Sequence, residues 1–242
     1  MPNEVILILS VLFLFGSVLL AYRMFGKSGL YAMTVIATVF SNIEVLILVH
    51  AFGMEQTLGN VLFAATFLIT DILSENEGKK AANLAVSLGI FTSAFSIVLT
   101  QGWFLYTPSE ADWVMPSVQT IFTNTPRTML ASLLAYVISQ YFDVWLYHKW
   151  WSVTTRRFGD SKRFLWLRNN GSTLVSQIVN TLVFTVVAFL GMYPAFTVLS
   201  LFLSTYVIYI FTSLLDTPCV YIARIIKTKW LNRKDEAVSE QA

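Results

Sequence analysis

Long apolar runs alternate with short polar connections along the whole chain. A helix that crosses a bilayer needs about 20 mostly apolar residues. Helices are expected rather than strands, because an open strand in lipid leaves its backbone polar groups unpaired. The pattern predicts seven membrane-spanning helices, at 4–22, 29–52, 57–73, 81–104, 127–149, 171–191 and 195–216.

The stretch 114–126 does not follow this pattern, since it contains Pro116 and Pro126. It is compatible with either a short re-entrant piece or an interfacial piece. No internal repeat is visible in the chain. We therefore expect an all-α membrane protein with one transmembrane domain over 1–232, and a polar cytoplasmic tail at 233–242 that is disordered.

Composition excludes a soluble protein. Apolar types make up 56% of the 242 residues and charged types 12%, whereas a soluble domain carries about a quarter charged residues. The net charge of +2 gives no support to a nucleic-acid partner. The lone cysteine, Cys219, excludes an internal disulfide and a cysteine-based metal cluster.

The distribution of positive charge predicts the orientation of the helices. Every Lys and Arg except Arg127 falls on alternate connections or in the C-terminal segment. Cytoplasmic loops carry the excess of Lys and Arg. With seven helices, the N-terminus is therefore expected outside and the C-terminus in the cytoplasm. The expected location is the cell (plasma) inner membrane, with the lipid bilayer as solvent.

Polar residues inside the predicted helices are the main candidates for function, because a central charge costs about 2.5–3.5 kcal/mol on insertion scales. In the sixth predicted helix, polar side chains recur at steps of three and four and so share one face. Interhelical hydrogen bonding is the structural alternative for the hydroxyl groups. The candidate substrate-binding residues are Asn42, Glu44, Asp71, Arg127, Gln140, Asp143, Asn169, Ser176, Gln177 and Asn180.

Two sets of charged residues are expected to form pairs, because buried charges need partners. Glu44 and Arg127 both lie toward the outer side, and we expect them to meet at an outer mouth. Three aspartates lie near cytoplasmic helix ends. Their expected partners are basic residues of the inner face, either for function or for simple structural bridging. The aspartates are Asp71, Asp143 and Asp216, and the basic residues are Lys79, Lys80 and Arg168.

Motifs of catalysis are missing from the sequence. There is no phosphate-binding loop of the Gly-x-x-x-x-Gly-Lys-Ser/Thr type, no Gly-x-Ser-x-Gly elbow and no His-Glu-x-x-His helix. His50 and His148 have no neighbours at metal-ligand spacing and are interpreted as interfacial residues. We expect no catalytic residue, no metal and no cofactor, and interpret the chain as a non-enzyme.

Four segments, in order, resemble the queuosine precursor transporter family, also called the vitamin uptake transporter family. They are Phe67–Ala81, with Asp-Ile-x-x-Glu-x-x-Gly-Lys-x-Ala inside it, Pro126–Asp143, Leu167–Gln177 and Asp216–Pro218. The resemblance covers about 29–225. It implies a six-helix core, to which the helix 4–22 is an addition.

The resemblance implies import of 7-cyano-7-deazaguanine, 7-aminomethyl-7-deazaguanine or queuine. The amides of Asn42, Gln140, Gln177 and Asn180 suit such a base, a carboxylate such as Glu44 or Asp143 could accept from its guanidine-like edge, and aromatic rings could stack on it. One position departs from the family, whose members often have an acidic residue where this chain has Asn180. An amide cannot serve as a counter-ion, which bears on whether a cationic ligand is recognised.

Two other classes of function stay open at this stage. The chain could be the substrate-binding membrane subunit of an importer that borrows an ATPase, or an intramembrane enzyme. A homodimer and a coupling partner are both left open. The driving force is also open, although Glu44, Asp71, Asp143 and Asp216 can titrate in a medium of low dielectric constant.

Overall fold

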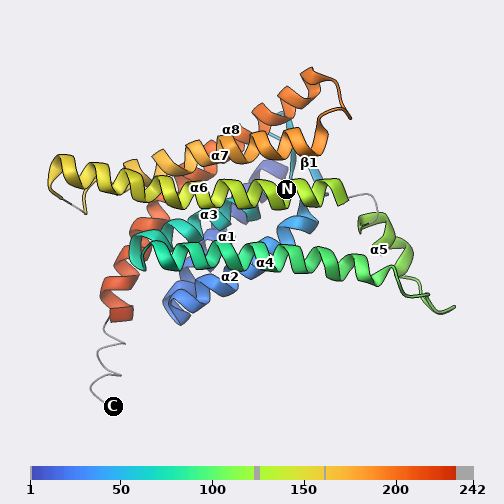
Figure 1. The fold of residues 1–242 in the computed structure, drawn as a ribbon, viewed down its shortest axis with the longest axis horizontal. Helices are drawn as coiled ribbons and strands as arrows, with labels where there is room; N and C mark the ends of the chain where they lie inside the picture. The colour runs from blue at the N-terminus through green and yellow to red at the C-terminus, as the bar shows by residue number, and fades with distance from the viewer. Residues whose placement is uncertain (1, 123–125, 161, 233–242) are drawn as a thin grey trace, which may run out of the picture.

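The structure is a computed structural model that describes residues 2–122, 126–160 and 162–232. The predicted tail at 233–242 lies outside the described residues. Helices dominate the fold and run roughly along one another (Figure 1). Its elements are α1 (Asn3–Phe25), α2 (Lys27–Glu44), β1 (Leu48–Ala51), β2 (Met54–Thr57), α3 (Gly59–Asn76), α4 (Lys79–Trp103), α5 (Met115–Phe122), α6 (Pro126–Phe158), α7 (Leu165–Phe189) and α8 (Ala195–Ile226), with a π-helical turn at Lys227–Leu231.

Five of the helices, α1, α4, α6, α7 and α8, are long and apolar enough to cross a membrane. The helices α2 and α3 are 18 residues each and fall outside that group. In α3 every residue from Gly59 to Ser74 is buried, so this helix has no lipid-facing side that would have to be apolar. The all-helical membrane class is supported, and the total of seven spans stays a prediction.

The predicted span 29–52 is wrong beyond Glu44. The helix α2 ends there, and β1 and β2 form an antiparallel hairpin in which Leu48 lies opposite Thr57. Phe52 and Gly53 at its tip both have positive φ, 53° and 73°, as a tight two-residue turn requires. Phe52 N donates to Glu4 Oε1 at 3.1 Å. His50 therefore belongs to a strand and not to a helix end.

The ambiguous stretch 114–126 contains the short helix α5, beside the end of α4. Trp103 of α4 packs edge-on against Phe122 at 5.9 Å between ring centroids. Residues 123–125 lie outside the described part. The helix α6 is longer than predicted, since it continues from the expected end at 149 to Phe158.

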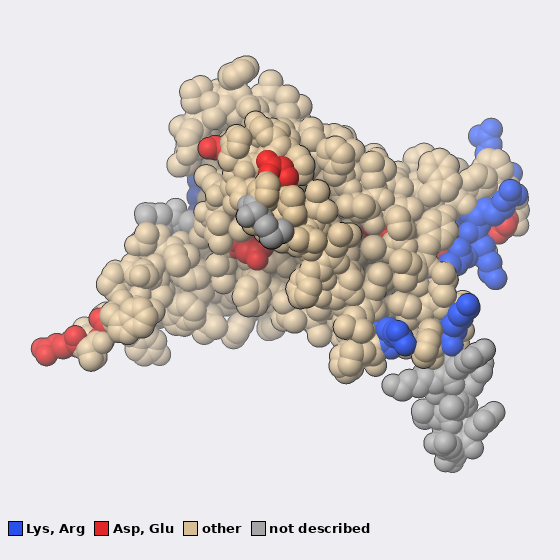
Figure 2. Space-filling view, turned by 180° about the vertical axis from the view of Figure 1, so that it is seen from behind, with Lys and Arg blue, Asp and Glu red and all other residues tan. Residues whose placement is uncertain are grey.

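Charge divides the molecule into two ends. Lys and Arg gather at the end that holds the α6–α7 connection and the end of α8, as Figure 2 shows. We call this the basic end, and the opposite one, with β1 and β2, the hairpin end. This separation agrees with the sequence, in which Lys and Arg fall on alternate connections between the predicted helices.

A buried ion pair joins the helices at the basic end. Arg168 of α7 donates to Glu75 of α3 through Nε at 3.0 Å and Nη2 at 2.7 Å. Their side chains are 0% and 3% exposed. Tyr147 of α6 donates to the same carboxylate at 2.7 Å, and Arg224 of α8 lies 3.8 Å away. The guanidinium of Arg168 also lies 4.4 Å above the ring of Trp151.

A second acidic residue ties α1 to the bundle. Glu77 Oε1 accepts from Tyr22 of α1 and from Lys227, both at 2.8 Å. The expected pairing of Arg168, Lys79 and Lys80 with the aspartates is therefore wrong. Glu75 lies one turn beyond Asp71 on α3, and its carboxylate, not that of Asp71, pairs with the guanidinium of Arg168. Lys79 and Lys80 are exposed and form no ion pair with any described residue.

Glu75→Gln and Arg168→Gln are each expected to lower the free energy of unfolding by about 3–5 kcal/mol, because each leaves a buried charge without its partner. The double variant should lose less than the sum of the two. Thermal unfolding of the purified protein in detergent measures these losses. Lys80→Gln is the control and should unfold as the wild type does; additive losses would contradict the pairing.

Candidate functional site

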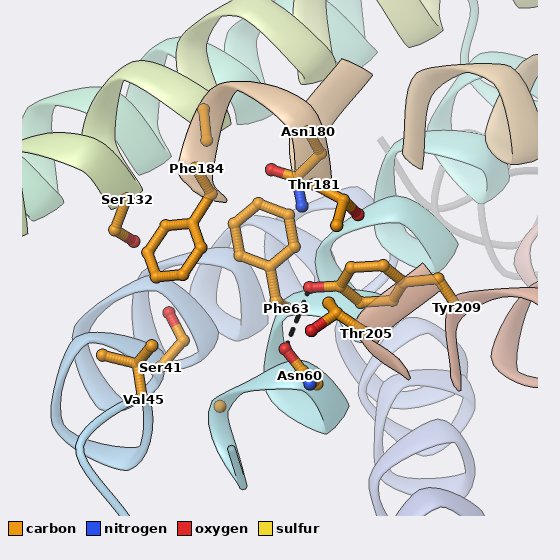
Figure 3. A pocket seen from close by; sticks show the side chains of 12 residues that line it. Ser41, Val45, Asn60, Phe63, Ser132, Asn180, Thr181, Phe184, Thr205 and Tyr209 are labelled. Carbon is orange, nitrogen blue, oxygen red and sulfur yellow. Dashed lines mark hydrogen bonds between the residues drawn. The ribbon is translucent and has the colours of Figure 1, made fainter. Parts of the chain in front are cut away.

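A small cavity lies between α2, α3, α6, α7 and α8, on the side of the hairpin end (Figure 3). Its free space is about 30 Å³, enough for about two water molecules. No charged side chain is among the described residues that line it. The lining consists of Ser41, Val45, Gly59, Asn60, Phe63, Ser132, Ala135, Asn180, Thr181, Phe184, Thr205 and Tyr209.

Asn60 presents an unpaired donor at this cavity. Its Oδ1 accepts from the hydroxyl of Tyr209 at 3.3 Å, the contact drawn as a dashed line in Figure 3. Its Nδ2 is buried and has no hydrogen-bond partner within the described chain. A buried donor without a partner costs about 1–3 kcal/mol. This amide is therefore a candidate donor to a ligand.

Two further amides lie at or beside the cavity. Asn42 Oδ1 accepts from Ser132 at 3.2 Å, while Asn42 Nδ2 is buried and unpaired among the residues described. Asn180 Oδ1 accepts only a long bond of 3.5 Å from Ser139. With Asn60, these residues bring amides from α2, α3 and α7 to one place.

Aromatic rings supply flat apolar walls. Figure 3 shows the rings of Phe63, Phe184 and Tyr209 around the same space. The Phe63 ring lies 6.3 Å from that of Tyr209, at an interplanar angle of 45°, and 5.9 Å from that of Tyr136, edge-on. Amides together with aromatic faces suit an uncharged or weakly polar heterocycle.

Gln140 and Gln177 lie outside this lining. Gln140 Nε2 donates to Thr66 at 2.7 Å, and its Oε1 accepts from Thr70 at 3.1 Å. Both ends of this amide are therefore used in joining α3 to α6, the structural role that the sequence left open for the hydroxyl groups. Gln177 is buried one turn before Thr181 on α7, and its Oε1 has no partner among the described residues.

The expected pairing of Glu44 with Arg127 is wrong. Arg127 Nε donates to the carbonyl of Val187 at 2.7 Å, and Nη2 to that of Leu190 at 2.6 Å. The last carbonyls of a helix have no partner within it, so the guanidinium satisfies the end of α7 instead. Glu44 is partly buried at the end of α2 and forms no ion pair with a described residue.

The aspartates form a second polar group nearer the basic end. Asp71, Asp143 and Asp216 come from α3, α6 and α8, and they interact electrostatically with one another. Asp71 Oδ2 accepts from Thr173 of α7 at 2.8 Å. Asn169 of α7 also faces Asp216. The structure thus does not bring the ten expected site residues into one site. Asn42 and Asn180 lie at or beside the cavity, and Asp71, Asp143, Asn169 and Ser176 lie in or beside the aspartate cluster. The other four, Glu44, Arg127, Gln140 and Gln177, belong to neither.

Sequence reasoning missed Asn60, Phe63, Ser132 and Tyr209. Asn60 had a usable signal, because it is an amide within the same apolar run as Asp71. The two aromatic residues had none, since an aromatic ring in an apolar run is equally suited to lipid. No group of His, Cys, Asp and Glu suited to a metal ion occurs in the described part of the chain.

Comparison with known proteins identifies the family of the chain. Residues 57–223 match a family described as "Putative vitamin uptake transporter". A protein of Bacillus subtilis (strain 168) described as "Probable queuosine precursor transporter" is 44% identical over 207 residues, which are 86% of this chain and 88% of that protein. No solved structure matches the chain.

Both descriptions are of transporters and not of enzymes, which confirms the interpretation of the sequence as a non-enzyme. They also confirm the resemblance carried by the four sequence segments. The matched region contains α3, α4, α6 and α7 and nearly all of α8. The chain is a multi-pass membrane transporter and belongs to the vitamin uptake transporter family.

Proposed function

We propose that the protein imports a queuosine precursor, a 7-deazaguanine base, into the cytoplasm. The observation that carries this proposal is the cavity between α2, α3, α6, α7 and α8, where aromatic rings meet the unpaired amide group of Asn60, with that of Asn42 beside it. The description of the Bacillus subtilis protein, at 44% identity, supports the same class of substrate.

The chemistry of the base matches the groups at the cavity. A 7-deazaguanine offers a carbonyl acceptor, ring and exocyclic N–H donors and a flat face. Asn60 Nδ2 and Asn42 Nδ2 donate to the acceptor side, and Asn180 Oδ1 accepts from the donor edge. The rings of Phe63 and Phe184 stack on the face. Asn60 Nδ2 and Asn42 Nδ2 would then gain the partners that they lack among the described residues, and Asn180 Oδ1 would exchange a long bond for a shorter one.

The cavity is too small for this base in the present conformation. Its free space of about 30 Å³ holds about two water molecules. Loading requires the side chains that fill the space, above all Phe63, Phe184 and Tyr209, to move apart together with their helices. Such a rearrangement is what an alternating-access cycle needs.

The neutral lining favours a neutral substrate. No Asp or Glu occurs among the described residues of the cavity wall, and Asn180 stands where family members often have an acid. A primary amine is charged at neutral pH and needs a counter-ion in a buried site. We therefore propose the 7-cyano base as the preferred substrate over the 7-aminomethyl base.

Asn60→Ala is expected to weaken the apparent affinity for 7-cyano-7-deazaguanine about tenfold or more, because loss of one buried hydrogen bond costs about 1–3 kcal/mol. Uptake of labelled base into liposomes containing only the purified protein measures this loss. Asn83→Ala on α4, an amide far from the lining, should transport as the wild type does. Equal affinities of the two variants would exclude Asn60 from the site, and uptake that needs an added ATPase would favour the subunit alternative.

Asn180→Asp is expected to reverse the preference, because it places a carboxylate at the cavity wall. Competition between the 7-cyano and 7-aminomethyl bases in the same vesicles measures the ratio of the two affinities. We expect the ratio to shift at least about tenfold toward the amine, the size of one charge-assisted contact. An unchanged ratio would mean that the substituent of the base does not approach Asn180.

We further propose that the basic end faces the cytoplasm and that the protein lies in the plasma membrane. In a Cys219→Ser background, Ser109→Cys lies in the connection between α4 and α5, and Lys162→Cys lies in that between α6 and α7. A membrane-impermeant maleimide should label the first in intact cells and the second only after permeabilisation. The reverse pattern would overturn the orientation.

A further inference from the structure

The aspartate cluster, Asp71, Asp143 and Asp216, is buried at the meeting point of α3, α6, α7 and α8. The three residues are 0%, 0% and 2% exposed. Asp71 interacts with both other carboxyl groups. Three negative charges this close to one another in the interior of a membrane protein would be very costly, because each loses its hydration and each repels the others.

The cluster has no cation within the described chain to offset these charges. Glu75 of α3 is the next acidic group, and it already binds Arg168 of α7 and Tyr147 of α6. From α8 the cluster is faced by Cys219, which carries no positive charge. No salt bridge joins a described Lys, Arg or His to any of the three aspartates.

Unpaired oxygen atoms point to a missing positive ligand. Both carboxyl oxygens of Asp143 lack a hydrogen-bond partner in the described part of the protein, as do Asp71 Oδ1 and Asp216 Oδ1. Two fully buried neighbours from α7 are unpaired as well, Ser176 Oγ beside Asp143 and Asn169 Oδ1 beside Asp216. The carboxylate and amide oxygens among these atoms can only accept hydrogen bonds, and the hydroxyl of Ser176 can donate just one, to Asp143. The site therefore needs a further donor.

A proton meets this need better than a metal ion. No group of three or more His, Cys, Asp and Glu suited to a metal occurs in the described residues. A carboxyl group that takes up a proton loses its charge and becomes a donor to the neighbouring carboxylate. The same proton therefore removes the repulsion and supplies a hydrogen bond.

We propose that the aspartate cluster is the proton-binding site that drives transport. This inference rests on the proposed import function and names its energy source. The proton enters from the outer water, is held among the three carboxyl groups while the substrate is enclosed, and leaves to the cytoplasm. In the conformation described here, at least one of the three carboxyl groups is protonated.

A polar connection links the cluster to the cavity. Thr70 precedes Asp71 on α3 and donates to Gln140 of α6, which donates in turn to Thr66, one turn from Phe63 in the cavity wall. If α3 moved against α6 on substrate binding, the hydrogen bonds of Thr66 and Thr70 with Gln140 would change. The distance between Asp71 and Asp143 would change at the same time. The two sites are thus placed to affect each other through shared helices.

The test is uptake of labelled 7-cyano-7-deazaguanine into vesicles with an imposed pH gradient, acid outside. The wild type should accumulate the base about tenfold for each unit of pH difference, as expected for one proton per neutral substrate. In Asp143→Asn the ratio of accumulation with and without the gradient should fall to about one. Asp112→Asn, the same change in an exposed loop, should keep the ratio of the wild type.

A second measurement needs neither substrate nor transport. Infrared spectroscopy of the purified wild type at neutral pH should show the C=O stretch of a protonated, buried carboxyl group, and Asp143→Asn should reduce or remove it. If that variant does not fold, Asp71→Asn and Asp216→Asn are used in its place, beside the wild-type spectrum.

The outcomes separate the two proposals. Failure of the base to enter vesicles, with the infrared band present, would overturn the proposed substrate and leave the proton site standing. Absence of the band, or accumulation driven by a sodium gradient and not by pH, would overturn the proton site. An unchanged gradient ratio in all three aspartate variants would do the same.

Discussion

The complete burial of α3 is the constraint on which the rest of the structure depends. Every residue from Gly59 to Ser74 is covered by other helices, so the polar groups on this helix must be satisfied by protein and not by water. At its acidic end, Glu75 is matched by Arg168 and Tyr147. A buried carboxylate without such partners would be strongly destabilising, and this requirement holds α6 and α7 in register against α3.

The hydrogen bonding of buried polar groups along α3 is uneven. At Thr66 and Thr70 the hydrogen bonds with Gln140 are complete. At Asn60, Asp71, Ser74 and Asn76 buried atoms have no partner among the residues that the structure describes. Proteins depart from full satisfaction of buried polar groups chiefly at functional sites. Two of these levels are the cavity and the aspartate cluster, and the complete level at Thr66 and Thr70 lies between them.

The wrong expectations share one physical cause. The position of a charged residue along a predicted helix gives its depth in the membrane. It does not show which hydrogen-bonding group of a neighbouring helix lies nearest to it in the folded protein. Arg127 was expected to meet Glu44, yet the unpaired carbonyls at the end of α7 lie closer. Arg168 was expected to meet an aspartate, yet Glu75 offers two oxygens one turn away. Hydropathy also could not distinguish β1, Leu48–Ala51, from the end of a helix, because this strand continues the apolar run that follows α2.

The sequence by itself determined the membrane class, the course of five long apolar helices, the uneven distribution of Lys and Arg and the family, because each depends on local composition or on ordered motifs. Only the tertiary structure decided which polar residues share a site. In the tertiary structure Gln140 forms interhelical hydrogen bonds, and Asn60 and Tyr209 lie at the cavity. The three aspartates lie together and form no salt bridge with a described Lys, Arg or His. Those outcomes depend on how the helices rotate and pack, which residue spacing along one chain does not specify.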